Sequence, residues 1–359
     1  MIQARMRRHF AAGAESAAFD LDVEFEAREG VTVMFGASGA GKTLTLDCLA
    51  GFARPDSGRI LLDDRLLYDG DAGVCLRPQE RGCGYVFQNY ALFPHMTLRE
   101  NLVFAAERLP RLERHRRVNE MLERFRIAEF AGRYPHEVSG GQKQRGSIAR
   151  ALIVQPRLLL LDEPARGLDA PLREDLYDLL RDLRQEFRVP TLLVTHDIEA
   201  AFAVGDEMLV YHDGRIAQRG KPRAVLNQPV SEAVARLFGY DTFLEAEVLK
   251  LNPAEDRSTL RLLSGEFQGP YYPGSLIGDH LTLCVHPDEL RVVDDGGANR
   301  CAGVVTGTVE RPGGVRLRLM MPGSAGVTVD VPRAQSQTAA ERKELWVEFP
   351  PAALHTLRK

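Results

Sequence analysis

The sequence is poor in cysteine, and its cysteines form no pattern. No CxxC pair is present, and no cysteine stands near histidine at the spacing of a metal site. A zinc site or a disulfide framework is therefore not indicated, and we interpret the thiols as buried or incidental. The five cysteines are Cys48, Cys75, Cys83, Cys284 and Cys301.

Long apolar runs and an excess of positive charge are also missing. No window has the length of uninterrupted apolar sequence that a membrane-spanning helix needs, and the Arg-rich start MIQARMRRHF lacks the apolar core of a secretory signal. We therefore expect a soluble, cytoplasmic chain. Lys and Arg number 46 against 50 Asp and Glu, a net charge of −4, so general nucleic-acid binding is not indicated.

The chain does have the length for two domains, with 359 residues of which 44% are hydrophobic. From about Val23 to about Val210, short apolar runs alternate with longer amphipathic stretches, which predicts a parallel sheet covered by helices. Residues 98–152 have helical periodicity without strand-like runs, and we expect a helical subdomain there. The first domain is therefore α/β.

The pattern changes after this α/β part. Asp213-Gly214 between two short apolar runs predicts a β-hairpin, and a short helical connection follows. From about Asp241 the sequence is rich in β-branched residues, Gly and Pro, which is typical of a small all-β sandwich or barrel. We expect a first domain over residues 1–232, a linker over 233–240 and a β-rich domain over 241–359.

The stretch GASGAGKT lies between the apolar run VTVMF and the predicted helix LTLDCLAGF, which is the strand–loop–helix context of a phosphate-binding loop. Its glycines let backbone N–H groups face the phosphates, Lys42 supplies a full charge, and the Thr43 hydroxyl can ligate Mg²⁺. A tight glycine turn before a helix is the alternative. The expected phosphate-binding residues are Gly36, Ala37, Ser38, Gly39, Ala40, Gly41, Lys42, Thr43 and Leu44.

Two carboxylates follow a run of four leucines in RLLLLDEP. The run predicts a strand buried on both faces, so Asp162 and Glu163 lie at the carboxyl edge, where α/β sheets bind ligands. We expect Asp162 to hold Mg²⁺ and Glu163 to polarise a water for attack on the γ-phosphorus. Capping of the next helix is the alternative role.

The stretch SGGQ precedes an amphipathic helix and offers a second helix N-terminus to an anion. A simple helix cap is the alternative. Because the chain has one GKT lysine, both helix starts could serve one nucleotide, or the second could face a nucleotide held by another copy.

Together these motifs resemble the ATPase subunit of ATP-binding cassette (ABC) transporters. The resemblance implies an α/β P-loop ATPase with a helical subdomain, MgATP as cofactor, and a head-to-tail homodimer that sandwiches ATP. It implies that Gln88 in GYVFQ contacts Mg²⁺ and the attacking water, and that His196 in LLVTHD contacts the γ-phosphate. The residues implied to act across the dimer are Ser139, Gly140, Gly141, Gln142 and Asp169.

The sequence departs from the family pattern at three places. Val138 stands where Leu is usual before SGGQ, and it preserves apolar packing. Arg166-Gly167 stands where the family has Ser-Ala, in a loop expected to cross the dimer. For the aromatic residue that stacks on adenine, Phe10 and Phe19 are candidates, and neither is well placed in the sequence.

A single cassette resembles importer ATPases, which work with two membrane permease subunits and, indirectly, a periplasmic or extracellular solute-binding protein. The implied location is peripheral, on the cytoplasmic face of the membrane. Residues 63–102 are most similar to the ATPases of molybdate importers, whereas NYALFPHMTLREN is shared with sulfate, ferric-iron, polyamine and sugar importers. The β-rich domain resembles the OB/barrel-like, oxyanion-binding regulatory extension.

Two rival classes remain. A soluble ABC ATPase that acts on DNA or ribosomes usually has long coiled coils or two cassettes in one chain, and neither feature is seen. A nucleotide-dependent metabolic enzyme would need a substrate site in the β-rich domain. No catalytic cluster is evident there, since His280 and His286 are interpreted as surface or core residues.

Overall fold

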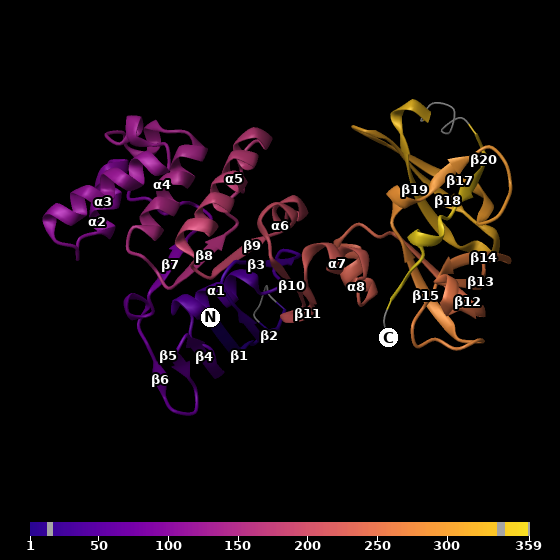
Figure 1. Cartoon of the computed structure of the whole chain (residues 1–359), viewed down its shortest axis with the longest axis horizontal. Helices are drawn as coiled ribbons and strands as arrows, with labels where there is room; N and C mark the ends of the chain where they lie inside the picture. The colour runs from indigo at the N-terminus through magenta and orange to yellow at the C-terminus, as the bar shows by residue number, and fades with distance from the viewer. Residues whose placement is uncertain (13–16, 336–341, 358–359) are drawn as a thin grey trace. The chain divides into compact units, whose positions relative to one another are not determined.

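The computed structural model describes residues 1–12, 17–335 and 342–357. The chain divides into two compact units, Met1–Arg223 and Ala224–Lys359, and Figure 1 shows both. The packing boundary therefore lies before residue 232, and the sequence-based division at 232–241 stays a prediction. No helix in the described ranges is long and apolar enough to cross a membrane.

Unit 1 contains the expected parallel sheet. Its strand order is β11-β10-β3-β9-β8-β7, in which the five strands from β10 to β7 are parallel and β11 is an antiparallel edge. The hairpin predicted at Asp213-Gly214 joins β10 to β11 and is confirmed. The strands are β3 (Val31–Gly36), β7 (Cys83–Val86), β8 (Leu158–Asp162), β9 (Thr191–Thr195), β10 (Glu207–His212) and β11 (Arg215–Gly220).

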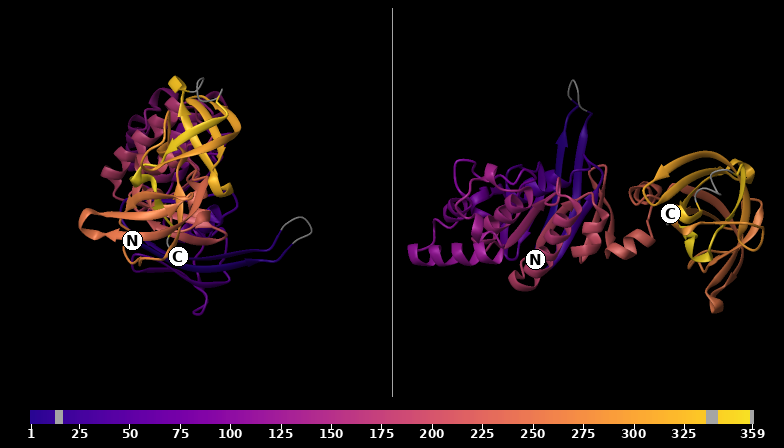
Figure 2. Two further views of the ribbon diagram at one scale, coloured as in Figure 1. Left: turned by 90° about the vertical axis from the view of Figure 1, so that its right-hand side faces the viewer. Right: turned by 90° about the horizontal axis from the view of Figure 1, so that it is seen from above.

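A second, antiparallel sheet in unit 1 was not predicted. Its order is β2-β1-β4-β5-β6, and the hairpin of β1 and β2 extends beyond the rest of unit 1 in both views of Figure 2. In β1 the buried residues Ile2, Ala4 and Met6 alternate with exposed polar ones, so one face enters the core. The strands are β1 (Ile2–Phe10), β2 (Phe19–Ala27), β4 (Ser57–Leu62), β5 (Arg65–Asp69) and β6 (Val74–Cys75).

The helices of unit 1 complete its layers. Buried residues of α1, such as Leu46 and Leu49, form one core with both sheets. The predicted helical subdomain is confirmed, and Figure 1 shows α2, α3 and α4 grouped at one end of unit 1. The helices are α1 (Lys42–Ala50), α2 (Leu98–Ala105), α3 (Arg111–Arg124), α4 (Gly140–Leu152), α5 (Ala170–Phe187) and α6 (Ile198–Val204).

Unit 2 is the expected β-rich part. Two antiparallel five-stranded sheets, β14-β13-β12-β15-β21 and β16-β20-β17-β18-β19, share one apolar core. Two short helices precede them, α7 (Pro222–Asn227) and α8 (Glu232–Leu237). The strands are β12 (Thr242–Asn252), β13 (Arg257–Leu262), β14 (Gly265–Pro270), β15 (His280–Val285), β16 (Arg291–Val293), β17 (Arg300–Arg311), β18 (Gly314–Met320), β19 (Gly326–Pro332), β20 (Glu344–Glu348) and β21 (His355–Thr356).

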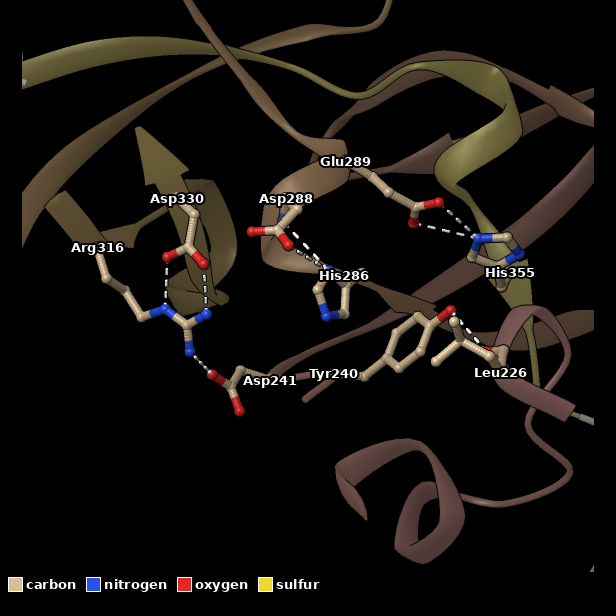
Figure 3. A network of polar contacts seen from close by, with 9 residues as sticks. All are labelled: Leu226, Tyr240, Asp241, His286, Asp288, Glu289, Arg316, Asp330 and His355. Carbon is tan, nitrogen blue, oxygen red and sulfur yellow. Dashed lines mark hydrogen bonds and ion pairs between the residues drawn. The ribbon is translucent and has the colours of Figure 1, made fainter. Parts of the chain in front are cut away.

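A polar network ties the start of unit 2 to its strands (Figure 3). The Tyr240 hydroxyl donates to the Leu226 carbonyl, and Arg316 bonds to both Asp330 and Asp241. Because Arg316 is largely buried, its ion pair with Asp330 is partly shielded from water. His286 accepts from the Asp288 backbone, which is a structural role, as the sequence suggested.

Candidate nucleotide site

The order of the parallel strands brings the predicted catalytic residues together. Neighbours β3, β9, β8 and β7 all run in one direction, so their carboxyl ends meet at one edge of the sheet. The phosphate loop follows β3, His196 follows β9, Glu163 follows β8, and Gln88 follows β7. Ligand sites of open α/β sheets lie at this edge.

The lysine of the loop is held by the loop itself. Lys42 is buried, and its Nζ donates to the carbonyls of Gly36 at 2.8 Å and Ala37 at 2.7 Å. Burial lowers the pKa of Lys42, and the nearby carboxylates of Glu163 and Asp162 partly oppose this effect. A cation in a loop of exposed backbone dipoles is suited to an anion of high charge density.

The N-terminus of α1 completes this anion site. Lys42, Thr43 and Leu44 form its first turn, where backbone N–H groups have no carbonyl of the helix to bond. Gly41 has φ +99°, and a Cβ there would lie only 3.1 Å from the Phe19 ring. Only glycine therefore fits at this position.

The aromatic candidates are better placed than the sequence suggested. The ring of Phe19 packs against Gly41, and Phe10 pairs with Phe19 across β1 and β2 with ring centroids 6.4 Å apart. The antiparallel pairing of β1 with β2 brings the two rings together. Sequence distance alone gave no sign of it.

Thr43 and Asp162 meet as a Mg²⁺ site requires. The Thr43 hydroxyl donates to Asp162 Oδ1 at 3.1 Å, although the two residues come from different elements. Burial raises the pKa of Asp162, an effect that the hydrogen bond from Thr43 only partly offsets. A hydroxyl and a carboxylate side by side are hard oxygen ligands of the kind Mg²⁺ prefers, so these residues fit that ion.

Glu163 follows β8 at the same sheet edge. Its φ of +45° is left-handed and costly for a residue with a Cβ, and its backbone N–H donates to Val194 of β9 at 3.0 Å. The side chain is only 15% exposed, and its Oε1 lies 3.2 Å from Nδ1 of His196. Glu163 and His196, which were predicted separately as catalytic residues, are therefore in contact.

One functional neighbour was missed by the sequence reasoning. Arg166, expected in a loop that crosses the dimer, turns back within the chain and contacts Glu163 and Gln88. The signal available was its position three residues after Glu163, beside a glycine. The contact with Gln88 could not be inferred, because Gln88 follows a different strand.

The residues expected to act across a dimer have local roles in this single chain. Ser139 caps α4 by accepting from the Gln142 backbone, and Gln142 accepts in return from the Ser139 backbone at 2.9 Å. Asp169 caps α5 by accepting from Leu172 at 3.1 Å. Gly141 faces α5, where a Cβ would lie 3.3 Å from Leu172. All these contacts lie within one copy of the chain.

A lysine-bearing glycine loop, a hydroxyl beside a carboxylate that fits Mg²⁺, and a second carboxylate along one sheet edge define a P-loop nucleoside triphosphatase. Comparison of the sequence and the fold with known proteins identifies the family within this class of nucleoside triphosphatases. The family described as "ABC transporter" matches residues 20–166. The spermidine/putrescine import ATP-binding protein PotA of Nitrosospira multiformis is 39% identical, over 78% of this chain and 76% of its own length.

Other relatives differ in their named solutes. The molybdenum import ATP-binding protein ModC of Rhodospirillum rubrum is 40% identical over 60% of this chain and 58% of its own length. The sulfate/thiosulfate import ATP-binding protein CysA of Gloeobacter violaceus is 43% identical over 61% of this chain and 62% of its own length. A dimeric bacterial ABC transporter cassette, MJ0796, superimposes with a TM-score of 0.54 at 30% identity, covering 62% of this chain and 99% of that one.

The chain belongs to the ABC transporter family, as an ATP-binding subunit of the importer type. It is an ATPase whose hydrolysis of ATP is coupled to transport. The fold class expected from the sequence is thereby confirmed. The comparisons do not single out molybdate as the transported solute, because relatives named for polyamines and sulfate match with comparable identity.

Proposed function

We propose that this chain powers uptake of a solute through separate membrane permease subunits by binding and hydrolysing MgATP at the sheet edge. The observation that carries the proposal is the meeting of Lys42, Asp162 and Glu163 there. Lys42 is buried, with its Nζ on two loop carbonyls, and the raised pKa of Asp162 reflects a carboxylate removed from water. Such groups are suited to a polyphosphate and its metal.

In this proposal each residue has a distinct task. Lys42 and the backbone N–H groups of the loop bind the phosphates, and Phe10 and Phe19 offer a stacking surface to the base. Thr43 and Asp162 would hold Mg²⁺, which would neutralise phosphate charge, whereas the amide oxygen of Gln88, predicted as a further ligand, faces Arg166. Glu163 orients the attacking water and accepts its proton, while His196 holds the Glu163 carboxylate.

The working form is proposed to be a homodimer. Ser139, Gly140, Gly141, Gln142 and Asp169 would then contact ATP held by the second copy. Two solved structures of the similar cassette MJ0796 are dimeric, one of them bound to ADP and Pi. The helix start at Gly140 would supply its N–H groups to the γ-phosphate in the same way as α1.

The permease subunits are proposed to dock on the segment from Gln88 to Glu100. Asn101 orders this segment, since its side chain bonds to both the N–H and the carbonyl of Phe93 and to the carbonyls of Met96 and Thr97. Nearby Phe104 is 49% exposed, so an apolar contact is available beside the ordered loop. The chain would then be peripheral on the cytoplasmic face of the membrane.

For the solute we propose an oxyanion, molybdate or tungstate, with the β-rich domain from residue 241 as a regulatory module. The likeness of residues 63–102 to molybdate-importer ATPases supports it. Polyamine import is the second candidate, because the PotA relative matches 78% of this chain against 60% for the molybdenum relative.

The test is ATPase activity of the chain reconstituted with its permease subunits and the solute-binding protein. Molybdate, tungstate, sulfate and spermidine are added separately. Stimulation by molybdate or tungstate alone supports the proposed solute, and stimulation by spermidine alone supports the second candidate. Absence of ATP hydrolysis in every sample, with Lys42→Ala as the blank, would overturn the importer ATPase itself.

A further inference from the structure

Arg166 stands in the turn that directly follows the proposed catalytic carboxylate. Its backbone N–H donates to the carbonyl of Glu163 at 3.1 Å, and Gly167 takes φ +75°. This tight turn reverses the chain between β8 and α5. The turn therefore places the side chain of Arg166 beside the side chain of Glu163.

The guanidinium joins two loops. Its Nη1 forms an ion pair with Glu163 Oε2 at 3.6 Å. With the Gln88 amide assigned so that its oxygen faces the guanidinium, Nη1 and Nε both donate to that oxygen, Nε at 3.1 Å. Glu163 follows β8 and Gln88 follows β7, two neighbouring parallel strands. One side chain therefore connects the proposed base to the first residue of the proposed permease-docking segment.

The contact with Arg166 supplies a charged partner to one carboxylate oxygen of Glu163. Oε1 faces His196, whereas Oε2 is buried and makes no hydrogen bond within the part of the chain that the structure describes. A buried carboxylate oxygen without a donor is costly. The positive charge of Arg166 is the ion-pair partner of that oxygen, so it restrains the rotation of the carboxylate.

We infer that Arg166 is a positioning residue for ATP hydrolysis, which holds the Glu163 carboxylate and ties it to Gln88. The inference rests on the proposed role of Glu163 as the base. Arginine suits the task because its planar group presents five N–H donors and can serve two acceptors at once. Lysine offers a single point charge, and serine, found at this place in the resembling family, cannot reach both partners.

The side chain is accessible to substitution. Arg166 is 60% exposed, so Arg166→Ala removes the bridge without opening a cavity in the core. Arg181 on α5 provides a matched control, because it is 53% exposed and forms an ion pair with Asp178 at the same i,i+3 spacing. Arg181→Ala therefore removes a comparable charge away from the sheet edge.

The first experiment measures steady-state ATPase kinetics of the purified full chain. We expect Arg166→Ala to lower kcat roughly tenfold, with KM for MgATP changed by less than about twofold, because orientation of the base is lost while the phosphate contacts remain. Arg166→Lys should restore part of kcat, and Arg181→Ala should match the wild type. A raised KM with unchanged kcat, or turnover equal to that of Arg181→Ala, would overturn the inference.

A double-mutant cycle then tests the bridge itself. If Arg166 acts through Gln88, the effects of Arg166→Ala and Gln88→Ala on kcat should be smaller together than the product of the two single effects. Fully multiplicative effects on kcat would show that Arg166 and Gln88 act independently and would contradict the bridge between them. Glu163→Gln distinguishes failure of the proposed base from failure of the positioning role. ATP turnover in Glu163→Gln contradicts the role of Glu163 as base. An inactive Glu163→Gln together with an unaffected Arg166→Ala contradicts only the positioning role of Arg166.

Discussion

The Thr43 hydroxyl donates to Asp162 across 3.1 Å, joining the first turn of α1 to the end of β8. The two residues lie far apart in the sequence, and the parallel strand order is what makes them neighbours. This pair fixes where a divalent ion would be held relative to the phosphate loop. Substitution of Thr43 can therefore separate the contribution of the metal to nucleotide affinity from the contribution of the phosphate loop.

Thr43→Val should weaken nucleotide binding only when Mg²⁺ is present. Valine has nearly the same shape but lacks the ligand oxygen, so we expect affinity for MgATP to fall by roughly tenfold, about 1.4 kcal/mol. Titration with a fluorescent ATP analogue, in Mg²⁺ and in EDTA, measures the difference. Thr45→Val is the control, since the Thr45 hydroxyl donates to Gly41 within the helix. Equal losses in both buffers would remove Thr43 from the metal site.

Mg²⁺ binding should also weaken on mild acidification. Burial raises the pKa of Asp162, so its carboxylate takes up a proton at a higher pH than an ordinary aspartate does. The metal needs the ionised form, and protons compete with it as the pH falls toward that raised pKa. MgATP affinity measured from pH 7.5 downward should drop more steeply than ATP affinity in EDTA. Parallel pH curves would contradict this assignment.

Lys42→Ala should abolish nucleotide binding by the loop. The side chain carries the full positive charge of the loop, and we expect a loss of about 100-fold or more in ATP affinity. Lys42→Arg keeps the charge but cannot fit the same pair of carbonyls, those of Gly36 and Ala37, and should be intermediate. Calorimetric titration with ATP provides the measurement. Near-normal affinity in Lys42→Ala would show that the loop does not bind phosphate.

Glu163→Gln should separate binding from hydrolysis. The amide keeps the size of the side chain but cannot accept a proton from water, so MgATP should still bind while turnover falls by about 1,000-fold. If ATP is shared between two copies, the unhydrolysed nucleotide should hold them together. Light scattering with and without MgATP reports the mass. A variant that neither hydrolyses ATP nor dimerises with it would count against the shared-nucleotide arrangement.

The candidate site residues were assigned from the sequence, whereas part of the scaffold around them was not. Lys42, Asp162 and Glu163 were assigned from local context, because a glycine-rich loop and an apolar strand are encoded by contiguous residues. The antiparallel sheet was overlooked, since the arginines of β1 masked the alternation of Ile2, Ala4 and Met6. Its burial on one face only becomes evident when β1 is paired with β2 and β4.

Contacts between loops were the other gap. The bond between Arg166 and Gln88 and the packing of Phe19 on Gly41 both depend on strand order and register. Neither leaves a trace in residue spacing. In unit 2 a β-rich domain was predicted from its richness in β-branched residues, Gly and Pro, whereas the ion pair of Arg316 with Asp241, at the start of the sheet, was not.

Arg316→Ala should destabilise unit 2. Its side chain is only 14% exposed and bonds to Asp330 and Asp241, so removal leaves two carboxylates without their cation (Figure 3). We expect a loss of about 2 kcal/mol in the free energy of unfolding, below that of a fully buried pair because both aspartates reach solvent. Arg261→Ala, which breaks an exposed pair with Glu247, should cost less than about 0.5 kcal/mol.

The same pair gives unit 2 a pH dependence of known sign. Burial alone would raise the pKa of Asp330, but its hydrogen bonds with Arg316 and Asp288 outweigh burial and lower it. The stabilisation is therefore complete above the ordinary aspartate pKa and is lost as the pH falls through the lowered one. For Asp288, burial and the neighbouring Asp330 raise the pKa, so its contribution favours acid and partly opposes the loss.

Trp346 makes this measurable in the full chain. It is the single tryptophan of the sequence and lies in β20, so its fluorescence follows unfolding of unit 2 alone. Urea unfolding at pH 7 should show the loss in Arg316→Ala and little change in Arg261→Ala. On acidification to pH 3 the wild type should lose stability faster than Arg316→Ala, because only the wild type has the pair to lose. Equal pH slopes would show that Arg316 does not hold Asp330 ionised.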